Sequence, residues 1–235
     1  MSATYRQNSS APARYWRDDP DNRLLARGPR YRLPAAVVRD QALAVSGLLD
    51  DRLGGPSVFP YQPPGMWQLT SNKAYEPSRG KDLYRRSLYT YWRRSIAPPT
   101  MFLFDAPDRE FCNVASRRTN TPLQALAALN ETGFFEAARA LAQRMMNEGG
   151  KTDHQRIAHG FRLVSAREPN EAESGVLLKS LKRYRAEFES DSAAADALIK
   201  IGDSKPDEQL APSELAAFAT VANMLLNMDK TLTKE

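Results

Sequence analysis

Apolar residues recur every three or four positions along most of this chain, which is the period of one face of an α-helix. The clearest stripes are Ile157, Phe161 and Val164, followed by Leu177, Leu181, Tyr184 and Phe188. No run of alternating apolar and polar residues is long enough to require a β-sheet. The spacing therefore predicts an all-α fold.

Start and stop signals place further helices. One stripe over residues 33–54 has Pro34 in its first turn, and another over residues 83–97 is stopped by Pro98. More helices are expected over residues 134–146 and 192–201, and from Ser213 onward.

The segment 121–130 carries the strongest start signal. Thr121 is placed as the N-cap and Pro122 stands at the first helical position. Gln124, three residues after the cap, is placed to reach back to the Thr121 amide.

Two long stretches interrupt the helices: GGPSVFPYQPPGMW at residues 54–67, and the irregular segment 98–120. Proline removes a backbone donor and fixes φ, so neither a helix nor a central strand can form where prolines cluster. We therefore expect an irregular helical domain with two long Pro-rich loops.

Composition divides the chain into three parts. Residues 1–32 are poor in apolar side chains and predict an extended arm. Residues 33–150 form the main helical domain. A junction at 149–153 leads to residues 151–235, which predict a small C-terminal helical subdomain.

Counts of special residues exclude several classes of site. A single Cys cannot form a disulfide within the chain. One Cys and two His match no familiar spacing of a zinc site or a covalent haem site, so no metal site is expected. The net charge of +5 is too small to favour nucleic acid. No apolar run approaches the roughly 18 residues of a membrane span. The polar first thirty residues hold no apolar signal segment.

The densest polar cluster lies in the irregular segment 98–120. Its carboxylates are candidates for an acid and base or for oxygen ligands of a cation, namely Asp105, Asp108 and Glu110. Its other polar residues are candidates for ligand binding: Arg109, Arg117, Arg118 and Asn120. The plainer interpretation is that turns and ion pairs within this cluster fix the loop to the helices.

Aromatic residues suggest two further surfaces. In residues 83–97, arginine pairs are interleaved with Tyr and Trp, a pattern that serves either phosphate and base contacts or a solvated rim around a core stripe. In the first Pro-rich loop, Tyr61 and Trp67 suit a platform for a sugar ring or a Pro-rich peptide, or else the rings bury against the helices. Cys112 is expected to be a small buried apolar side chain.

Three strings together resemble one protein family: GGPSVFPYQPPGMW, DLYRRSLYTYWRRSIAPPTMFLFDAPDRE and RRTNTPLQALAALN. They occur in the same order in the C-terminal domain of large planctomycete proteins that usually carry a cytochrome c-like module, known as the domain of unknown function 1553 family. The resemblance implies the C-terminal portion of a longer, extracytoplasmic protein, whose upstream domains are its partners. Haem is expected only in that upstream module, because its motif of two Cys followed by His is absent here.

Two functional hypotheses follow. The first is a non-catalytic interaction or ligand-binding module of a larger exported, haem-associated protein, with an anionic glycan or a protein as ligand. The alternative is a hydrolase or lyase acting on an anionic polysaccharide, with the carboxylates of residues 105–110 as acid and base and the nearby arginines holding the anion.

Overall fold

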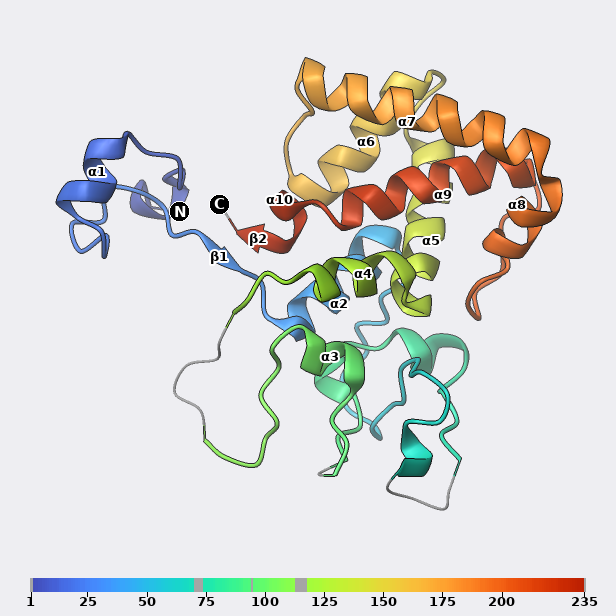
Figure 1. The fold of residues 1–235 in the computed structure, drawn as a ribbon, viewed down its shortest axis with the longest axis horizontal. Coiled ribbons are helices and arrows are strands. Elements are labelled where there is room, and N and C mark those ends of the chain that lie inside the picture. Colours follow the sequence, from blue (N-terminus) through green and yellow to red (C-terminus); the bar gives the residue numbers. More distant parts are fainter. Residues whose placement is uncertain (1, 70–73, 94, 113–117, 235) are drawn as a thin grey trace.

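Two alanine-rich helices cross at the centre of the molecule, α5 (Thr132–Glu148) and α9 (Pro212–Leu226) (Figure 1). Ala137, Ala138 and Ala142 on α5 and Ala216, Ala219 and Ala222 on α9 are fully buried. Because these side chains are small, the two helices approach closely. The computed structural model describes residues 2–69, 74–93, 95–112 and 118–234.

The other helices surround this pair and share one apolar core with it. They are α2 (Ala35–Ser46), α3 (Pro99–Leu103), α4 (Pro122–Asn130), α6 (Asp153–Ser165), α7 (Glu171–Ser190), α8 (Ser192–Ile199) and α10 (Asp229–Leu232). The described residues contain one sheet, of two short strands. The predicted all-α fold is confirmed.

Helices α6 and α7 begin where the sequence has complete capping boxes. Thr152 and Gln155 satisfy each other's backbone amides at the start of α6, and Asn170 and Glu173 do the same for α7. The predicted stripes on both helices face the core, where Phe161 and Leu181 are almost fully buried.

Helix α4 begins as predicted, with Thr121 as N-cap and Pro122 at the first position. The expected reach of Gln124 back to the Thr121 amide is wrong, because the buried Gln124 amide donates instead to Leu103 O, Asp105 Oδ2 and Thr119 Oγ1. The start of α9 also differs: Ala211 is the N-cap and Pro212, which fixes φ for the first turn, precedes Ser213.

The helix predicted over residues 83–97 does not form. The described part of this segment holds the end of one 3₁₀ turn, η3 (Gly80–Tyr84), and a second, η4 (Ser87–Tyr89), and the residues that follow them, Arg85 and Thr90, are extended. Val58 N donates to Tyr89 O, and Tyr91 N donates to Val58 O, both at 2.8 Å. These bonds to the first Pro-rich loop satisfy backbone hydrogen-bonding groups of the segment, so it stays non-helical although its apolar residues have helical spacing.

Two other predicted boundaries move. Helix α2 ends at Ser46 rather than near Gly54, because Gly47 adopts a φ of 80° and its amide caps the last turn. Helix α3 lies within the stretch predicted to be irregular, with Pro99 in its first turn.

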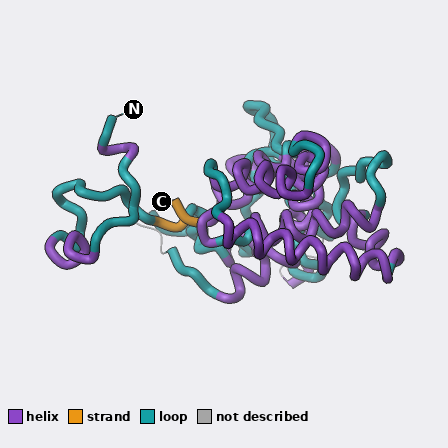
Figure 2. Tube along the Cα trace, turned by 90° about the horizontal axis from the view of Figure 1, so that it is seen from above, coloured by secondary structure: helices purple, strands orange, loops and turns teal. Residues whose placement is uncertain are grey.

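Residues 2–30 form a lobe that stands to one side of the helical body (Figure 1). It contains the 3₁₀ turn η1 (Thr4–Arg6) and helix α1 (Ala13–Asp18), and it leads into strand β1 (Tyr31–Arg32). Strand β1 pairs antiparallel with β2 (Thr233–Lys234), and Figure 2 shows this pair between the lobe and the body. None of the described helices is both long and apolar enough to cross a membrane.

Candidate functional site

The first Pro-rich loop is held to the body by a buried arginine. Arg85 is 1% exposed and donates to the carbonyl oxygens of Pro56 (3.0 Å), Arg52 (3.1 Å) and Gly54. Its guanidinium also stacks 3.8 Å from the centre of the Tyr89 ring. A planar group with five donors thus replaces the backbone partners that a Pro-rich loop lacks.

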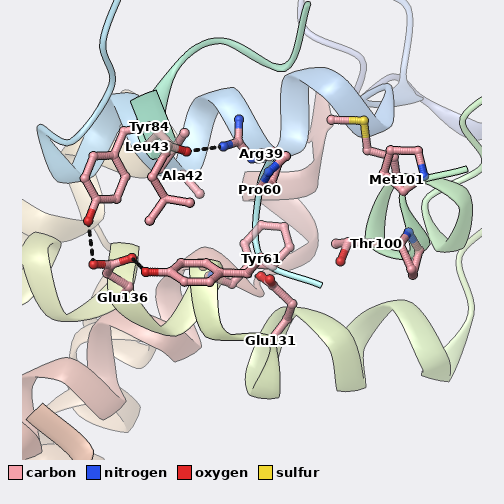
Figure 3. Close-up of a pocket in the computed structure, with 15 residues that line it drawn as sticks. Arg39, Ala42, Leu43, Pro60, Tyr61, Tyr84, Thr100, Met101, Glu131 and Glu136 are labelled. Carbon is pink, nitrogen blue, oxygen red and sulfur yellow. Dashed lines mark hydrogen bonds between the residues drawn. The ribbon is translucent and has the colours of Figure 1, made fainter. Parts of the chain in front are cut away.

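Beneath this loop lies a buried carboxylate, Glu136 on α5 (Figure 3). Tyr61 and Tyr84 donate their hydroxyl hydrogens to it at 3.0 and 2.7 Å, and Ser204 donates both its amide and its hydroxyl hydrogen at 2.6 and 2.7 Å. Arg139, which is also buried, lies 3.7 Å from the same carboxylate. Glu136 therefore joins the loop, α5 and the segment after α8.

Burial and the adjoining Glu136 carboxylate raise the pKa of both Tyr61 and Tyr84, so both hydroxyls stay protonated as donors. The pocket that these rings line beside Arg39, Glu131 and Thr100 has a volume of about 40 Å³. That volume suits one or two water molecules and is far below the roughly 300 Å³ of a small-ligand site. We interpret this interior pocket as part of the structural contact between the loop and α5, made by Tyr61 and Tyr84 with Glu136, and we call this contact the joint.

Trp67, the other predicted platform residue, lies in a cluster of rings. Its ring centre is 5.2 Å from Tyr75 and 6.2 Å from Tyr91, and the Arg93 guanidinium is 4.9 Å from it. Trp67 and Tyr61 therefore do not share a surface: Tyr61 points to Glu136, whereas Trp67 packs on other rings of the loop region.

A second pocket, of about 270 Å³, opens at the surface between α2, α3, residues 105–109 and Arg118. We call it the surface pocket. Three of the predicted site residues line it together, Asp105, Arg109 and Arg118. Its other polar lining residues are Asp40 of α2 and Ser87, and its aromatic ones are Trp92 and Phe104. Its volume approaches that of a small-ligand site.

The Asp105 carboxylate is fixed by its own loop. Its Oδ2 accepts hydrogen bonds from the Thr119 amide (2.6 Å), the Thr119 hydroxyl (2.7 Å) and the Gln124 side chain (3.3 Å). Partial burial acts to raise the pKa of Asp105, but these hydrogen bonds and the nearby Arg32 outweigh it and hold the pKa below its ordinary value. Asp105 is therefore ionised at neutral pH and has no proton to donate.

The two arginines of the surface pocket rest on aromatic rings. The Arg109 guanidinium lies 4.2 Å from the centre of the Trp92 ring, and the Arg118 guanidinium 4.9 Å from that of Tyr31. Both side chains are exposed, and no described carboxylate lies within ion-pairing distance of either. Asp105 and Arg109 both adopt positive φ, at 61° and 64°, a strained backbone conformation that recurs at functional loops.

The remaining predicted residues lie elsewhere. Asp108 Oδ1 accepts the Glu110 amide at 3.1 Å, which closes an exposed turn. Asn120 is exposed and does not line the surface pocket, and Arg117 lies outside the described residues. The expectation that Cys112 is buried is wrong, because its side chain is exposed, as are those of Glu110 and Phe111 before it.

Sequence reasoning missed Asp40 and Tyr31 as neighbours of the site, because they belong to a predicted helix and a predicted arm. The sequence places Trp92 on the apolar stripe of a predicted helix. Its position next to Arg93 and Arg94 is the only sequence signal that could have marked it as a site residue. Among the residues that the structure describes, no three His, Cys, Asp or Glu side chains are grouped to hold a metal ion.

The fold and the surface pocket define a mostly helical protein with a pocket of mixed charge between two helices and the loop that follows them. A family model described as a protein of unknown function, PSD1 (DUF1553), matches residues 1–181. The chain belongs to this family, as the three sequence strings suggested. Neither the curated proteins nor the solved structures that were searched contain a match.

Proposed function

We propose that this chain is a binding module for an anionic glycan and that the surface pocket is its binding site. The observation that carries the proposal is a pair of exposed arginines, Arg109 and Arg118, which line one pocket and have no carboxylate partner among the described residues. An arginine already oriented on a ring loses little freedom when it binds a carboxylate or sulfate group.

The carboxylates in the same pocket support a sugar as the ligand. Asp105 Oδ1 accepts no hydrogen bond in the described structure, so it is open to a sugar hydroxyl. Asp40 accepts the Ser87 amide through Oδ1 and lines the same pocket. An acidic sugar carries both kinds of group, an anion for the arginines and hydroxyl donors for the carboxylates.

Binding accounts for the pocket better than hydrolysis does. A glycosidase needs a protonated carboxyl group as general acid, typically one whose pKa is raised. The pKa of Asp105 is lowered instead, and Asp108 and Glu110 face an exposed turn rather than the pocket.

The test is calorimetric titration of the full chain with a uronic-acid disaccharide and with its neutral counterpart. We expect binding of the acidic sugar only, with at least about a tenfold loss in the Arg109→Ala/Arg118→Ala double variant. Arg79→Ala/Arg183→Ala removes two exposed arginines outside the pocket and is the control. Equal binding of the neutral sugar, or full affinity in the double variant, would overturn the proposal.

We also propose, on the family resemblance alone, that the module acts within a larger exported protein beside a haem-bearing module. An antibody to this chain, used on fractions of the source cells together with a haem stain, tests this. We expect a large, haem-positive band in the exported fraction. A haem-negative band near 26 kDa in the cytoplasm would contradict it.

A further inference from the structure

A wide cleft separates the N-terminal lobe from the helical body. Its volume is about 890 Å³. The lobe contributes residues 6–10 and Trp16, and the body contributes residues 163–167 together with residues from α10 and β2. Figure 2 shows the lobe standing off from the body, with the strand pair at the base of the gap.

The charge of this cleft is strongly biased. Its described lining includes five cations and no carboxylate: Arg6, Arg30, Arg167, Lys230 and Lys234. Two carboxylates near it are shared between cations. Asp229 lies 2.6 Å from Arg30 and 3.9 Å from Arg32, and Glu173 lies 2.6 Å from Arg167 and 3.7 Å from Lys230. The other two lining cations, Arg6 and Lys234, lie within ion-pairing distance of no described carboxylate, so they contribute a positive field for an anionic ligand.

One aromatic ring connects the cleft with the surface pocket. The Arg118 guanidinium of the surface pocket lies 4.9 Å from the centre of the Tyr31 ring, and Lys234 Nζ of the cleft lies 5.7 Å from the same centre. Lys234 Nζ is also 4.9 Å from the Tyr5 ring. One cation of each site thus lies against the same ring of β1, and this row of cations and rings links the two sites.

Each of these rings has at least one cation against it. Arg109 covers Trp92, Arg118 and Lys234 lie against Tyr31, and Arg27 lies 4.1 Å from the Trp16 ring. Single-stranded nucleic acids are typically bound by stacking bases on free aromatic faces. Here cations contact those rings, so the row favours a chain that carries anionic groups on sugars.

We infer that the cleft is a second subsite for the same ligand, and that the ligand is an extended polyanionic polysaccharide running from the surface pocket across Tyr31 into the cleft. This inference rests on the proposed function of the surface pocket. A chain that occupies both subsites gains affinity because its second contact is intramolecular.

The test compares a uronic-acid disaccharide with a long oligosaccharide of the same sugar, each titrated into the full chain. We expect the long chain to bind at least about tenfold more tightly. Arg6→Gln/Lys234→Gln should remove most of that gain and leave the affinity for the disaccharide unchanged. Arg17→Gln/Arg23→Gln removes two charges from exposed residues of the same lobe outside the cleft, and it should keep the gain.

The outcomes separate the two proposals. Suppose that Arg109→Ala/Arg118→Ala lowers the affinity for both ligands, but the long oligosaccharide binds no more tightly than the disaccharide. The surface pocket then stands and the cleft subsite is overturned. The same conclusion follows if the long oligosaccharide binds more tightly and keeps that gain in Arg6→Gln/Lys234→Gln. If the arginine pair of the surface pocket affects neither ligand, the proposed function fails and the subsite fails with it. Tighter binding of a single-stranded DNA homopolymer of equal charge would overturn the polysaccharide as the ligand.

Discussion

Buried arginines hold the irregular parts of this molecule in place. Arg85 donates to three carbonyl oxygens of the Pro-rich loop, Arg139 to those of Ile199 and Ser204, and Arg27 to those of Tyr15, Asp19 and Pro20 in the lobe. All three are less than 5% exposed. Their acceptor carbonyl groups lie in loops or in the last turns of helices, where regular secondary structure supplies few backbone donors.

We expect that lysine at position 85 does not preserve the stability that Arg85 provides. The Arg85→Lys variant keeps the charge, but its single ammonium group cannot reach three carbonyl oxygens in a fixed plane. We expect a loss of about 3 kcal/mol in the free energy of unfolding by urea and faster proteolysis within residues 50–57. Arg79→Lys, at an exposed position, serves as the control. A variant as stable as the parent would show that the loop is held in another way.

Gly202 is required by both its conformation and its neighbour. Its φ is +95°, and a Cβ there would lie 2.3 Å from Cδ of the buried Glu136. Gly65 has a φ of +85° with nothing within 4 Å of its Cβ position, so Gly65→Ala measures the conformational cost alone, about 1 kcal/mol. We expect Gly202→Ala to cost at least about 2 kcal/mol more in urea unfolding. Equal losses in the two variants would mean that Glu136 moves aside freely.

At the scale of elements, the start of α7 combines a capping box with an ion pair. Glu173 accepts the Asn170 amide at 2.9 Å and both Arg167 amino groups at 2.8 and 2.6 Å. The bonds from Arg167 in particular lower the pKa of Glu173 to about 2. Because the folded-state pKa is depressed, its stabilising effect is full above about pH 4.5 and is lost as the pH falls towards 2.

The Glu173→Gln variant isolates this charge, since Gln keeps an acceptor for the capping box. We expect it to unfold in urea with about 1 kcal/mol less stability at neutral pH and to approach the parent as the pH is lowered from 4.5 to 2. Glu189→Gln, at an exposed position on the same helix, is the control. A difference that stays constant with pH would exclude the carboxylate as its cause.

Sequence reasoning locates helices whose stabilising contacts are made by residues close to one another in the sequence. Helices α4, α6 and α7 carry their N-caps and apolar stripes inside their own segments, so local pattern was sufficient. The segment 83–97 has an equally good stripe, yet its backbone pairs with Val58, about thirty residues away. Spacing alone does not reveal such a partner, because a loop without regular structure has no period of its own.

At the scale of the molecule, the same distinction applies to the site. Asp105, Arg109 and Arg118 could be predicted together because one loop carries them, whereas Trp92 and Asp40 reach the surface pocket only through folding. The joint of Tyr61 with Glu136 spans 75 residues and left no local signal. The cleft depends on residues near both ends of the chain, which no motif connects.

The strand pair also sets an order of events during synthesis. Tyr31 and Arg32 are synthesised about two hundred residues before their partners Thr233 and Lys234. At typical elongation rates the lobe waits about 10 to 40 s for its place on the body. During that interval the lobe and the body do not yet enclose the cleft together, so a ligand that needs both walls can bind only after Lys234 has emerged and β2 has paired with β1.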